Sequence, residues 1–351
     1  TISLFYLFII PNLYGKVNHN HHLIWFPAIL AFSPCADRFS LDAFFCRLKN
    51  KVVHHSSAHY TLPLAFIWIL IGLIYFFPGF WKLWSHGLDW SLTDNVRNHM
   101  YYKWFQLSDW QTHWTPFFRI DQYPFFYKAS GIFTIIFELS FIPLILNKST
   151  RKVGILIGLL FHIATYAFMN IFFIVLVWSY LSFVNWNSIS FLKERGNMSS
   201  LKYSEFYHTL VKWIGGGLIV SCILFGFGKW YSYPFTAYPT FDNMVEEEQE
   251  YLIYSAKTRS GKHLKLNNDL LRKEFSSERY WEMESRIITE LKDNKLLDTN
   301  LLEHFIAVQI SELDSLTSVS VSIESQSILP EKRLLVNRES IYSKAYNSFD
   351  F

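Results

Sequence analysis

An apolar run from Tyr60 to Trp81 most constrains what this chain can fold into. A helix needs about 20 mostly apolar residues to span the hydrocarbon core of a bilayer, and this run meets that length by itself. Further apolar runs cover residues 2–14, 22–35, 129–146, 153–169, 171–186 and 210–228. Seven runs predict an all-α polytopic membrane bundle of about seven spans rather than the buried helices of a soluble protein. Because Thr1 already lies inside an apolar run, an eighth span upstream is left open.

The composition agrees with a membrane location and argues against other classes of partner. Of the 351 residues, 51% are hydrophobic and only 17% are charged, whereas a soluble domain carries about 25% charged residues. A net charge of +3 is too small to indicate nucleic-acid binding, so the predicted surroundings are the lipid bilayer. The three cysteines have no metal-ligand spacing, and no metal site is predicted from them.

The basic residues orient the predicted bundle. The loops that follow the second, fourth and sixth runs carry ten of them: Arg38, Arg47, Lys49, Lys51, Lys148, Arg151, Lys152, Lys193, Arg195 and Lys202. Cytoplasmic loops are enriched in Lys and Arg, which makes that side cytoplasmic. Loop 15–21, the end of the third run and the whole region after Trp230 are then expected on the outer, non-cytoplasmic face.

The composition changes near Tyr233 and divides the chain into two predicted domains. Residues 1–232 form the helix bundle, and residues 233–351 form a small α+β domain on the outer face. Alternating and helical apolar patterns predict the elements of that domain. They are a strand over Tyr251–Thr258 with a hairpin turn into His263–Leu266, helices over Phe275–Lys292 and Leu301–Ile310, and a strand around residues 319–323.

Ionisable residues inside apolar runs are costly and therefore mark candidate sites. Glu138 and His162 lie near the middle of their runs, at similar depth, where they could pair; a structural polar pair explains them equally well. Lys82 ends the third run, and the simplest interpretation is a lysine whose ammonium reaches the membrane surface. The loop histidines His19, His21 and His22 could bind a metal, but no carboxylate or cysteine nearby completes a ligand set.

Several stretches together resemble one family. They are Asn18-His19-Asn20 followed by Ser40-Leu41-Asp42, then Tyr75-Phe76-Phe77-Pro78-Gly79-Phe80-Trp81-Lys82-Leu83 with Asp89-Trp90, then Phe161-His162, and finally the aromatic and proline residues of 233–239. Over roughly residues 15–190 their order is similar to that in vitamin K-dependent γ-glutamyl carboxylases and in the wider horizontally transferred transmembrane domain (HTTM) family. The stretch 233–239 resembles the exit into the outer domain of the bacterial members.

The resemblance implies a membrane enzyme, a lyase and oxygenase, that uses reduced vitamin K, a naphthohydroquinone, without a metal. In that family a lysine deprotonates the hydroquinone, oxygen adds, and the base formed on the way to the epoxide removes a proton from a substrate glutamate, which captures carbon dioxide. The base lysine falls on Lys82, and the functional histidine falls on His19. Phe80, Trp81 and His162 are the residues expected to bind the quinone.

The departures from the family leave two functional interpretations. Trp81 replaces the first lysine of the family's pair, and the C-terminal domain is much smaller than that of the animal enzymes. The first interpretation is a quinol-dependent oxygenase or carboxylase that acts on a protein substrate at the outer face. The second is a non-catalytic subunit of a larger membrane-protein assembly. A bacterial inner membrane is expected rather than the endoplasmic reticulum, because the resemblance extends to the bacterial members.

Overall fold

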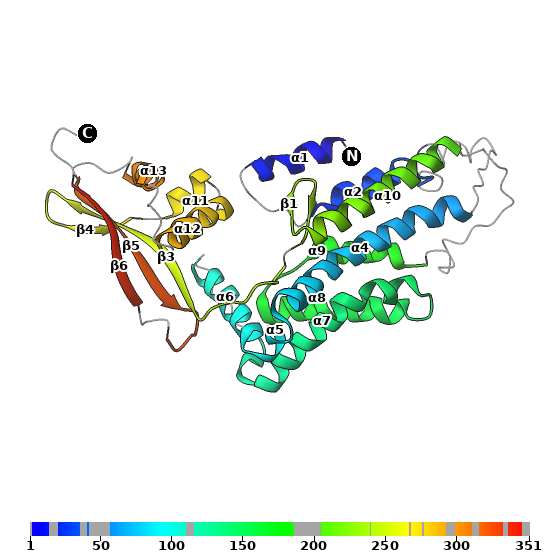
Figure 1. Ribbon diagram of the computed structural model, residues 1–351, viewed down its shortest axis with the longest axis horizontal. Coiled ribbons are helices and arrows are strands. Elements are labelled where there is room, and N and C mark those ends of the chain that lie inside the picture. Colours follow the sequence, from blue (N-terminus) through cyan, green and yellow to red (C-terminus); the bar gives the residue numbers. More distant parts are fainter. Residues whose placement is uncertain are drawn as a thin grey trace. The chain divides into compact units, whose positions relative to one another are not determined.

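The computed structural model of the chain describes two compact units (Figure 1). The described residues are 2–13, 20–35, 41, 57–109, 116–185, 205–238, 240–266, 268–275, 277–292, 299–310, 316–332 and 336–345. The first unit, here called the helical unit, covers residues 1–9, 18–100 and 110–244. The second, here called the sheet unit, covers residues 10–17, 101–109 and 245–351. The contacts therefore group residues 233–244 with the helices.

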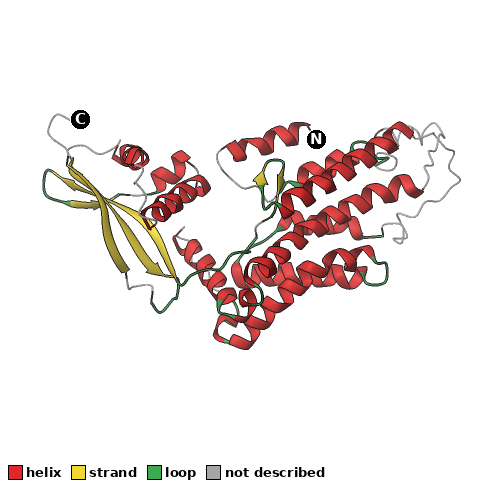
Figure 2. Ribbon diagram, viewed as in Figure 1, coloured by secondary structure: helices red, strands yellow, loops and turns green. Residues whose placement is uncertain are grey.

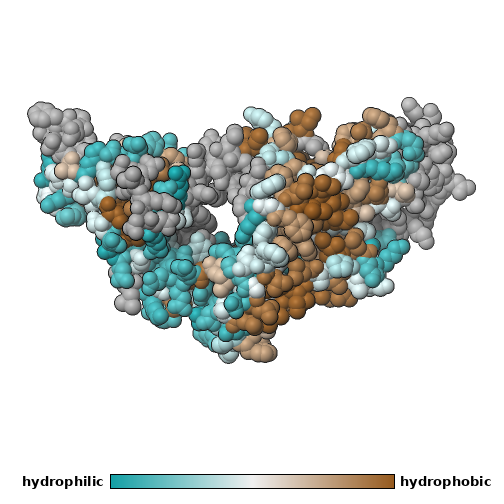
Figure 3. Space-filling model, viewed as in Figure 1, coloured by the Kyte–Doolittle hydropathy of each residue, from teal (hydrophilic) through white to brown (hydrophobic). Residues whose placement is uncertain are grey.

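Four helices of the described residues are long and apolar enough to cross a membrane. They are α4 (Ser57–His86), α7 (Pro124–Leu146), α8 (Arg151–Met169) and α10 (Glu205–Phe227). Figure 3 shows apolar side chains gathered over these helices, while the surface of the sheet unit is mostly hydrophilic. These four helices support a membrane protein.

The described residues do not support the predicted count of about seven spans, because three of the apolar runs form short helices there. These are α1 (Ile2–Leu13), α2 (His22–Leu30) and the pair α9 (Ile174–Ser179) and η2 (Tyr180–Phe183). At about 1.5 Å per residue, a nine-residue helix covers less than half of a hydrocarbon core about 30 Å thick. The side of the membrane assigned to the C-terminal region depended on seven crossings, so it stays a prediction.

Helix α4 lies at the centre of the helical unit and packs against α7, α10 and α2 (Figure 2). The core is built from apolar side chains of these helices and of α9 and η2. The short elements α9 and η2 are apolar in sequence, and their buried side chains contribute to this core. The smaller elements of this unit are α5 (Asp89–Leu92), α6 (Asn95–Asp109, which continues into the sheet unit), η1 (Ile120–Gln122), and the hairpin strands β1 (Tyr231–Ser232) and β2 (Phe235–Thr236).

Close packing of α4 on α10 gives a first prediction. Gly226 lies against the Phe77 ring, and a Cβ atom at that position would overlap the ring. Gly226→Ala is therefore expected to destabilise the bundle by about 1–3 kcal/mol. Unfolding of the purified protein by SDS in mixed micelles measures this. Gly216→Ala is the matched control, because a Cβ added at this position of the same helix would meet no atom within 4 Å, and it is expected to leave stability unchanged or slightly raised. Equal losses from the two variants would contradict the packing.

The sheet unit contains a four-stranded antiparallel sheet in the order β4-β3-β5-β6. The strands are β3 (Glu248–Thr258), β4 (His263–Lys265), β5 (Leu316–Ser327) and β6 (Val336–Ala345), and the helices are α11 (Asp269–Phe275), α12 (Ser277–Lys292) and α13 (Thr299–Ile310). The predicted strands, turn and two helices of this region are confirmed; α11 and β6 were not predicted.

Alternation along the strands explains how this sheet is covered. Leu252, Tyr254 and Ala256 of β3 lie opposite Ile323, Val321 and Val319 of β5 in the strand register. These side chains share one face of the sheet and pack with apolar residues of α11, α12 and α13 in a single core. The neighbouring positions point to the other face and are mainly polar, such as Ser255 and Ser320, although Ile253 on that face is also buried.

Candidate functional site

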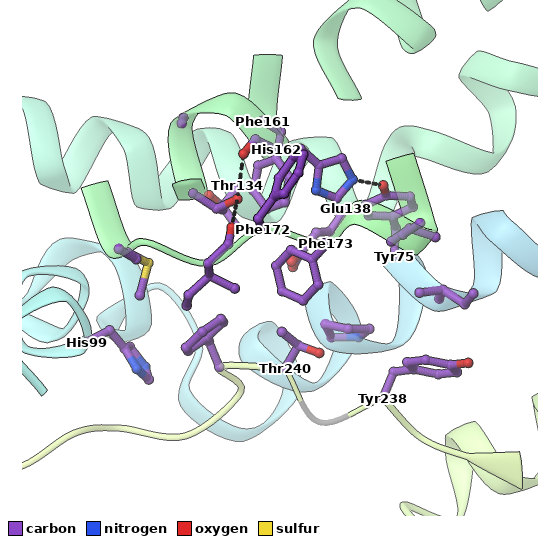
Figure 4. Close-up of a pocket in the computed structure, with 18 of the residues that line it drawn as sticks. Tyr75, His99, Thr134, Glu138, Phe161, His162, Phe172, Phe173, Tyr238 and Thr240 are labelled. Atoms are coloured by element: carbon purple, nitrogen blue, oxygen red, sulfur yellow. Dashed lines mark hydrogen bonds between the residues drawn. The ribbon is translucent and has the colours of Figure 1, made fainter. Parts of the chain in front are cut away.

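A cavity of about 610 Å³ lies in the helical unit. Its volume is within the range of small-molecule sites. Most of the lining is apolar, and polar side chains reach it from a few elements, including Lys82 of α4. Figure 4 shows three others, Glu138 of α7, His162 of α8 and His99 of α6. An apolar chamber with a few converging polar groups is the usual form of a ligand site.

The polar end of the cavity contains a buried ion pair. Lys82 Nζ lies 2.9 Å from both carboxylate oxygens of Glu138 and donates a third hydrogen bond to the carbonyl oxygen of Thr240 at 3.0 Å. The Lys82 side chain is 1% exposed. The interpretation of Lys82 as a residue that extends to the membrane surface is therefore wrong. A Cβ atom on Gly79 would lie 2.7 Å from Glu138 Cβ, so this glycine lets α4 and α7 approach closely beside the pair.

Residues 238 and 240–243 are here called the strap, and Tyr238, Thr240 and Phe241 among them line the cavity. Its carbonyl oxygens accept hydrogen bonds from side chains of three helices. Thr240 accepts from Lys82, Phe241 from Trp90 Nε1 at 2.9 Å, and Asn243 from His99 Nε2 at 3.0 Å. Tyr238 and Phe241 have positive φ angles of 48° and 56°, a backbone conformation that costs about 1–3 kcal/mol and needs surrounding structure to hold it.

His99 is neutral in this environment. Burial lowers its pKa to about 4, the hydrogen bond to Asn243 opposes that shift, and the nearby Lys82 charge adds to it. Because a carbonyl oxygen only accepts hydrogen bonds, the proton of the neutral ring is assigned to Nε2. His99 therefore holds the strap without adding a charge beside the ion pair.

A second polar group lies deeper along α4. The Tyr75 hydroxyl is 2.5 Å from His162 Nε2 and 2.8 Å from the Tyr180 hydroxyl, and all three side chains are buried. If Tyr180 donates to Tyr75 and Tyr75 donates to His162, both hydroxyl hydrogens are used. The imidazole proton is then on Nδ1, a buried atom that has no hydrogen-bond partner among the described residues.

Glu138 and His162 are both buried, as predicted, and each has polar neighbours. Of the two predicted alternatives, pairing with each other or with neighbouring polar groups, the structure has the second, because Glu138 pairs with Lys82 and His162 with Tyr75. The positions of the partners on α4 explain this arrangement. Tyr75 and Lys82 are seven residues apart, so they lie two turns apart on one face of the helix, and each reaches a different partner.

The other predicted site residues lie elsewhere. Phe80 packs against Phe76, Trp84 and Phe227, and Trp81 Nε1 donates to the carbonyl oxygen of Gly226 at 2.8 Å. Neither lines the cavity, since both lie on the side of α4 that faces α10. His19 lies outside the described residues, although its neighbours Asn20 and His22 line the cavity. Within the described residues, no group of three or more His, Cys, Asp or Glu is arranged to hold a metal ion.

Trp90, His99, Thr240 and Tyr75 were not predicted as site residues, and all four line the cavity. Trp90 carried a signal, because it belongs to the Asp89-Trp90 pair and its ring lies 5.1 Å from Lys82 Nζ. Thr240 acts through a backbone carbonyl, which no residue type reveals. Comparison of the chain with protein-family models, with curated proteins and with solved structures found no match.

Proposed function

We propose that this membrane protein is related to the vitamin K-dependent carboxylases and the wider HTTM family and performs quinol-dependent oxidation at the Lys82–Glu138 end of its cavity. The observation that carries the proposal is a fully buried ion pair at the polar end of a mainly apolar cavity. Buried charges in a membrane bundle are costly and usually functional. The proposed setting is the non-cytoplasmic face of a bacterial inner membrane, with a protein glutamate as the substrate to be carboxylated.

The cavity fits a reduced naphthoquinone in size and in the distribution of polarity. Its volume of about 610 Å³ exceeds that of a two-ring head group, and its apolar lining suits an isoprenoid tail. When bound, a reduced naphthoquinone supplies an electron-rich ring that oxygen can oxidise. Lys82, Glu138 and Trp90 are the residues that would hold the head group, because they converge at the polar end.

The ion pair suggests how the two residues divide the work. The carboxylate beside Lys82 stabilises the charged ammonium, so Lys82 is better suited to hold a negative charge than to remove a proton. Glu138 can accept a proton at Oε1 or Oε2 from an acidic hydroxyl. The negative charge left on that oxygen then replaces the carboxylate as the partner of Lys82 Nζ. The total charge of the site is unchanged, which matters in a medium of low dielectric constant.

Epoxide formation tests the proposal directly. The purified protein in lipid bilayers is given reduced naphthoquinones of several tail lengths and oxygen, and the epoxide is measured. Lys82→Ala and Lys82→Arg are expected to abolish the product, since the arginine fork does not reproduce the ammonium geometry. Glu138→Gln is expected to lower the rate by roughly 100-fold or more. Lys128→Ala, on the same helix as Glu138 but outside the cavity, is expected to match the wild type.

Absence of epoxide from the wild-type chain with every quinone would overturn the enzymatic proposal. Product from Lys82→Ala equal to that of the wild type would keep an oxidative activity but remove Lys82 from it. Product from Glu138→Gln equal to that of the wild type would return the proton-accepting role to Lys82.

One observation favours the second candidate, a non-catalytic subunit of a membrane-protein assembly. All three N–H groups of Lys82 have acceptors, two on Glu138 and one on the Thr240 carbonyl. A pair satisfied in this way joins α4, α7 and the strap without needing a ligand. The second candidate would be supported by a wild-type chain that forms no epoxide and that purifies from its native membrane with another membrane protein at fixed stoichiometry.

A further inference from the structure

Four apolar side chains line the cavity and are also exposed on the outside of the helical unit. They are Phe133 of α7, Leu160 of α8, and Phe172 and Ile174 from the segment that follows α8, and they are between 43% and 55% exposed. A side chain that borders both a cavity and the outer surface belongs to a wall one residue thick. These four side chains, here called the rim, therefore mark where the cavity comes closest to the surroundings of the protein.

The rim lies where α7 and α8 diverge. Near the turn that joins them the two helices are in close contact, because a Cβ on Gly154 would lie 3.0 Å from Leu144 Cβ and the Phe137 and Phe161 rings are 5.0 Å apart. Farther from the turn, the space between them is part of the cavity and is lined by Ser130 and Thr134 of α7 and by Ala164 of α8. Both helices are candidate membrane spans, so the outside of this opening faces lipid.

Among the described residues, the side chains at the polar end of the cavity are buried. Lys82, His22, His99 and Tyr238 line the cavity at the polar end or beside it and are at most 4% exposed. The strap lines that end, held by Lys82, Trp90 and His99. Polarity thus increases from the rim, which is apolar, to the buried ion pair.

We propose that the cavity opens sideways into the bilayer between α7 and α8, and that its ligand enters as a molecule already dissolved in the lipid. The ligand class is a single-tailed amphiphile, whose polar head moves toward Lys82 and Glu138 while its tail stays at the rim. The proposal rests on the cavity being the ligand site of the proposed function, but the opening itself is independent of quinol chemistry. A ligand delivered from water would instead need an open path through the polar end.

The experiment compares a lipid-soluble thiol reagent with a charged one on a cysteine inside the cavity. The protein is prepared with Cys35, Cys46 and Cys222 replaced by serine or alanine, Thr134→Cys is added, and the chain is reconstituted in phosphatidylcholine vesicles. N-phenylmaleimide, which partitions into the bilayer, is expected to react at least ten times faster than a quaternary-ammonium methanethiosulfonate. Both rates are normalised to those of the SDS-denatured protein.

Two alanines of α8 provide a matched pair of blocking variants. Ala164 lines the cavity beside the rim, whereas Ala167 is exposed and does not line it. Ala164→Trp is expected to slow maleimide labelling of Thr134→Cys by at least ten-fold, and Ala167→Trp is expected to leave it unchanged. Labelling of Ile136→Cys, on the exposed face of α7, is expected to be insensitive to both tryptophans and shows that the reagent still enters the bilayer.

Faster labelling by the charged reagent, or no effect of Ala164→Trp, overturns the lateral opening. Because no quinone is present, this result does not depend on epoxide formation. An active enzyme without lateral labelling would mean that the ligand enters from water, whereas lateral labelling without epoxide would leave a lipid-open cavity with a different ligand.

Discussion

Lys82→Met alone is expected to destabilise the protein by about 3–5 kcal/mol, because it leaves the Glu138 carboxylate buried without its cation. Glu138→Leu is expected to cost a similar amount, since Lys82 would lose its only carboxylate partner among the described residues and keep the Thr240 carbonyl and the Trp90 ring. The double variant Lys82→Met/Glu138→Leu removes both charges and fills the space with apolar atoms. It is expected to be more stable than either single variant, because replacing a whole buried ion pair is often close to neutral.

A double-mutant cycle in SDS-containing mixed micelles measures this coupling. The surface pair of Lys128 and Asp94, 3.9 Å apart and more than a third exposed on both sides, is the control, and Lys128→Met is expected to cost less than about 1 kcal/mol. If the losses of the two single variants simply add in the double variant, the buried pair does not exist in the folded protein. In that case the proposed division of roles between Lys82 and Glu138 also fails.

The number of spans could not be predicted from the sequence, because an apolar run has the same composition whether it is buried inside the protein or surrounded by lipid. Trp25 and Ile29 of α2 are at most 1% exposed, inside the bundle rather than in lipid. Helix α8 ends at Asn170, which has a φ angle of 54°, and the predicted runs 153–169 and 171–186 already divide at this residue. The second of these runs forms only the short α9 and η2, whose Tyr180 and Phe183 are at most 6% exposed inside the bundle.

The residues of the candidate site could be predicted where an ionisable side chain interrupts an apolar run. Which of these side chains contact each other could not be predicted, because that depends on the three-dimensional arrangement of the helices. Lys82, Glu138 and His162 were found in this way, and all three line the cavity. Their pairing depends on the rotation of each helix about its axis, which the sequence does not give. That rotation also turns Phe80 and Trp81 toward α10, away from the cavity, although they are the immediate neighbours of Lys82.

In the sheet unit, the inner strands could be predicted because apolar and polar residues alternate along them. Val319 and Val321 alternate with serines along β5, which is paired on both sides. The edge strand β6 has Arg338, Glu339 and Lys344 among its ten residues and lacks such a pattern. Charged residues on an edge strand discourage pairing with other chains. They also interrupt the alternation of apolar and polar residues by which a strand is predicted from sequence.

The open edge of β3 gives the second large expected effect. Strand β4 pairs with residues 255–257 of β3, so among the described residues no strand lies beside the backbone of Leu252 on that side. Glu284 of α12 accepts a hydrogen bond from the Leu252 N–H at 2.8 Å and another from the Tyr280 hydroxyl at 3.0 Å, and Asn268 donates to the Leu252 carbonyl at 3.1 Å. Side chains thus replace the missing strand.

Glu284→Ala is expected to cost about 2–3 kcal/mol, because it leaves the buried Leu252 N–H and the Tyr280 hydroxyl without this acceptor. Hydrogen exchange of the intact chain measures the effect at the site: protection of the 248–258 segment should fall by roughly 30- to 140-fold, at about 1.4 kcal/mol for each factor of ten. Glu284→Gln keeps one carbonyl oxygen as an acceptor and should lose less.

The control for this variant is Glu290→Ala on the same helix. Glu290 pairs with Arg286 at 2.8 Å, and the arginine side chain is 68% exposed. Loss of this ion pair in Glu290→Ala should change the free energy of protection by less than about 1 kcal/mol. Equal effects of Glu284→Ala and Glu290→Ala would mean that the edge of β3 is not capped by α12. The helix would then hold the sheet only through the apolar contacts of Tyr280, Ile287 and Ile288.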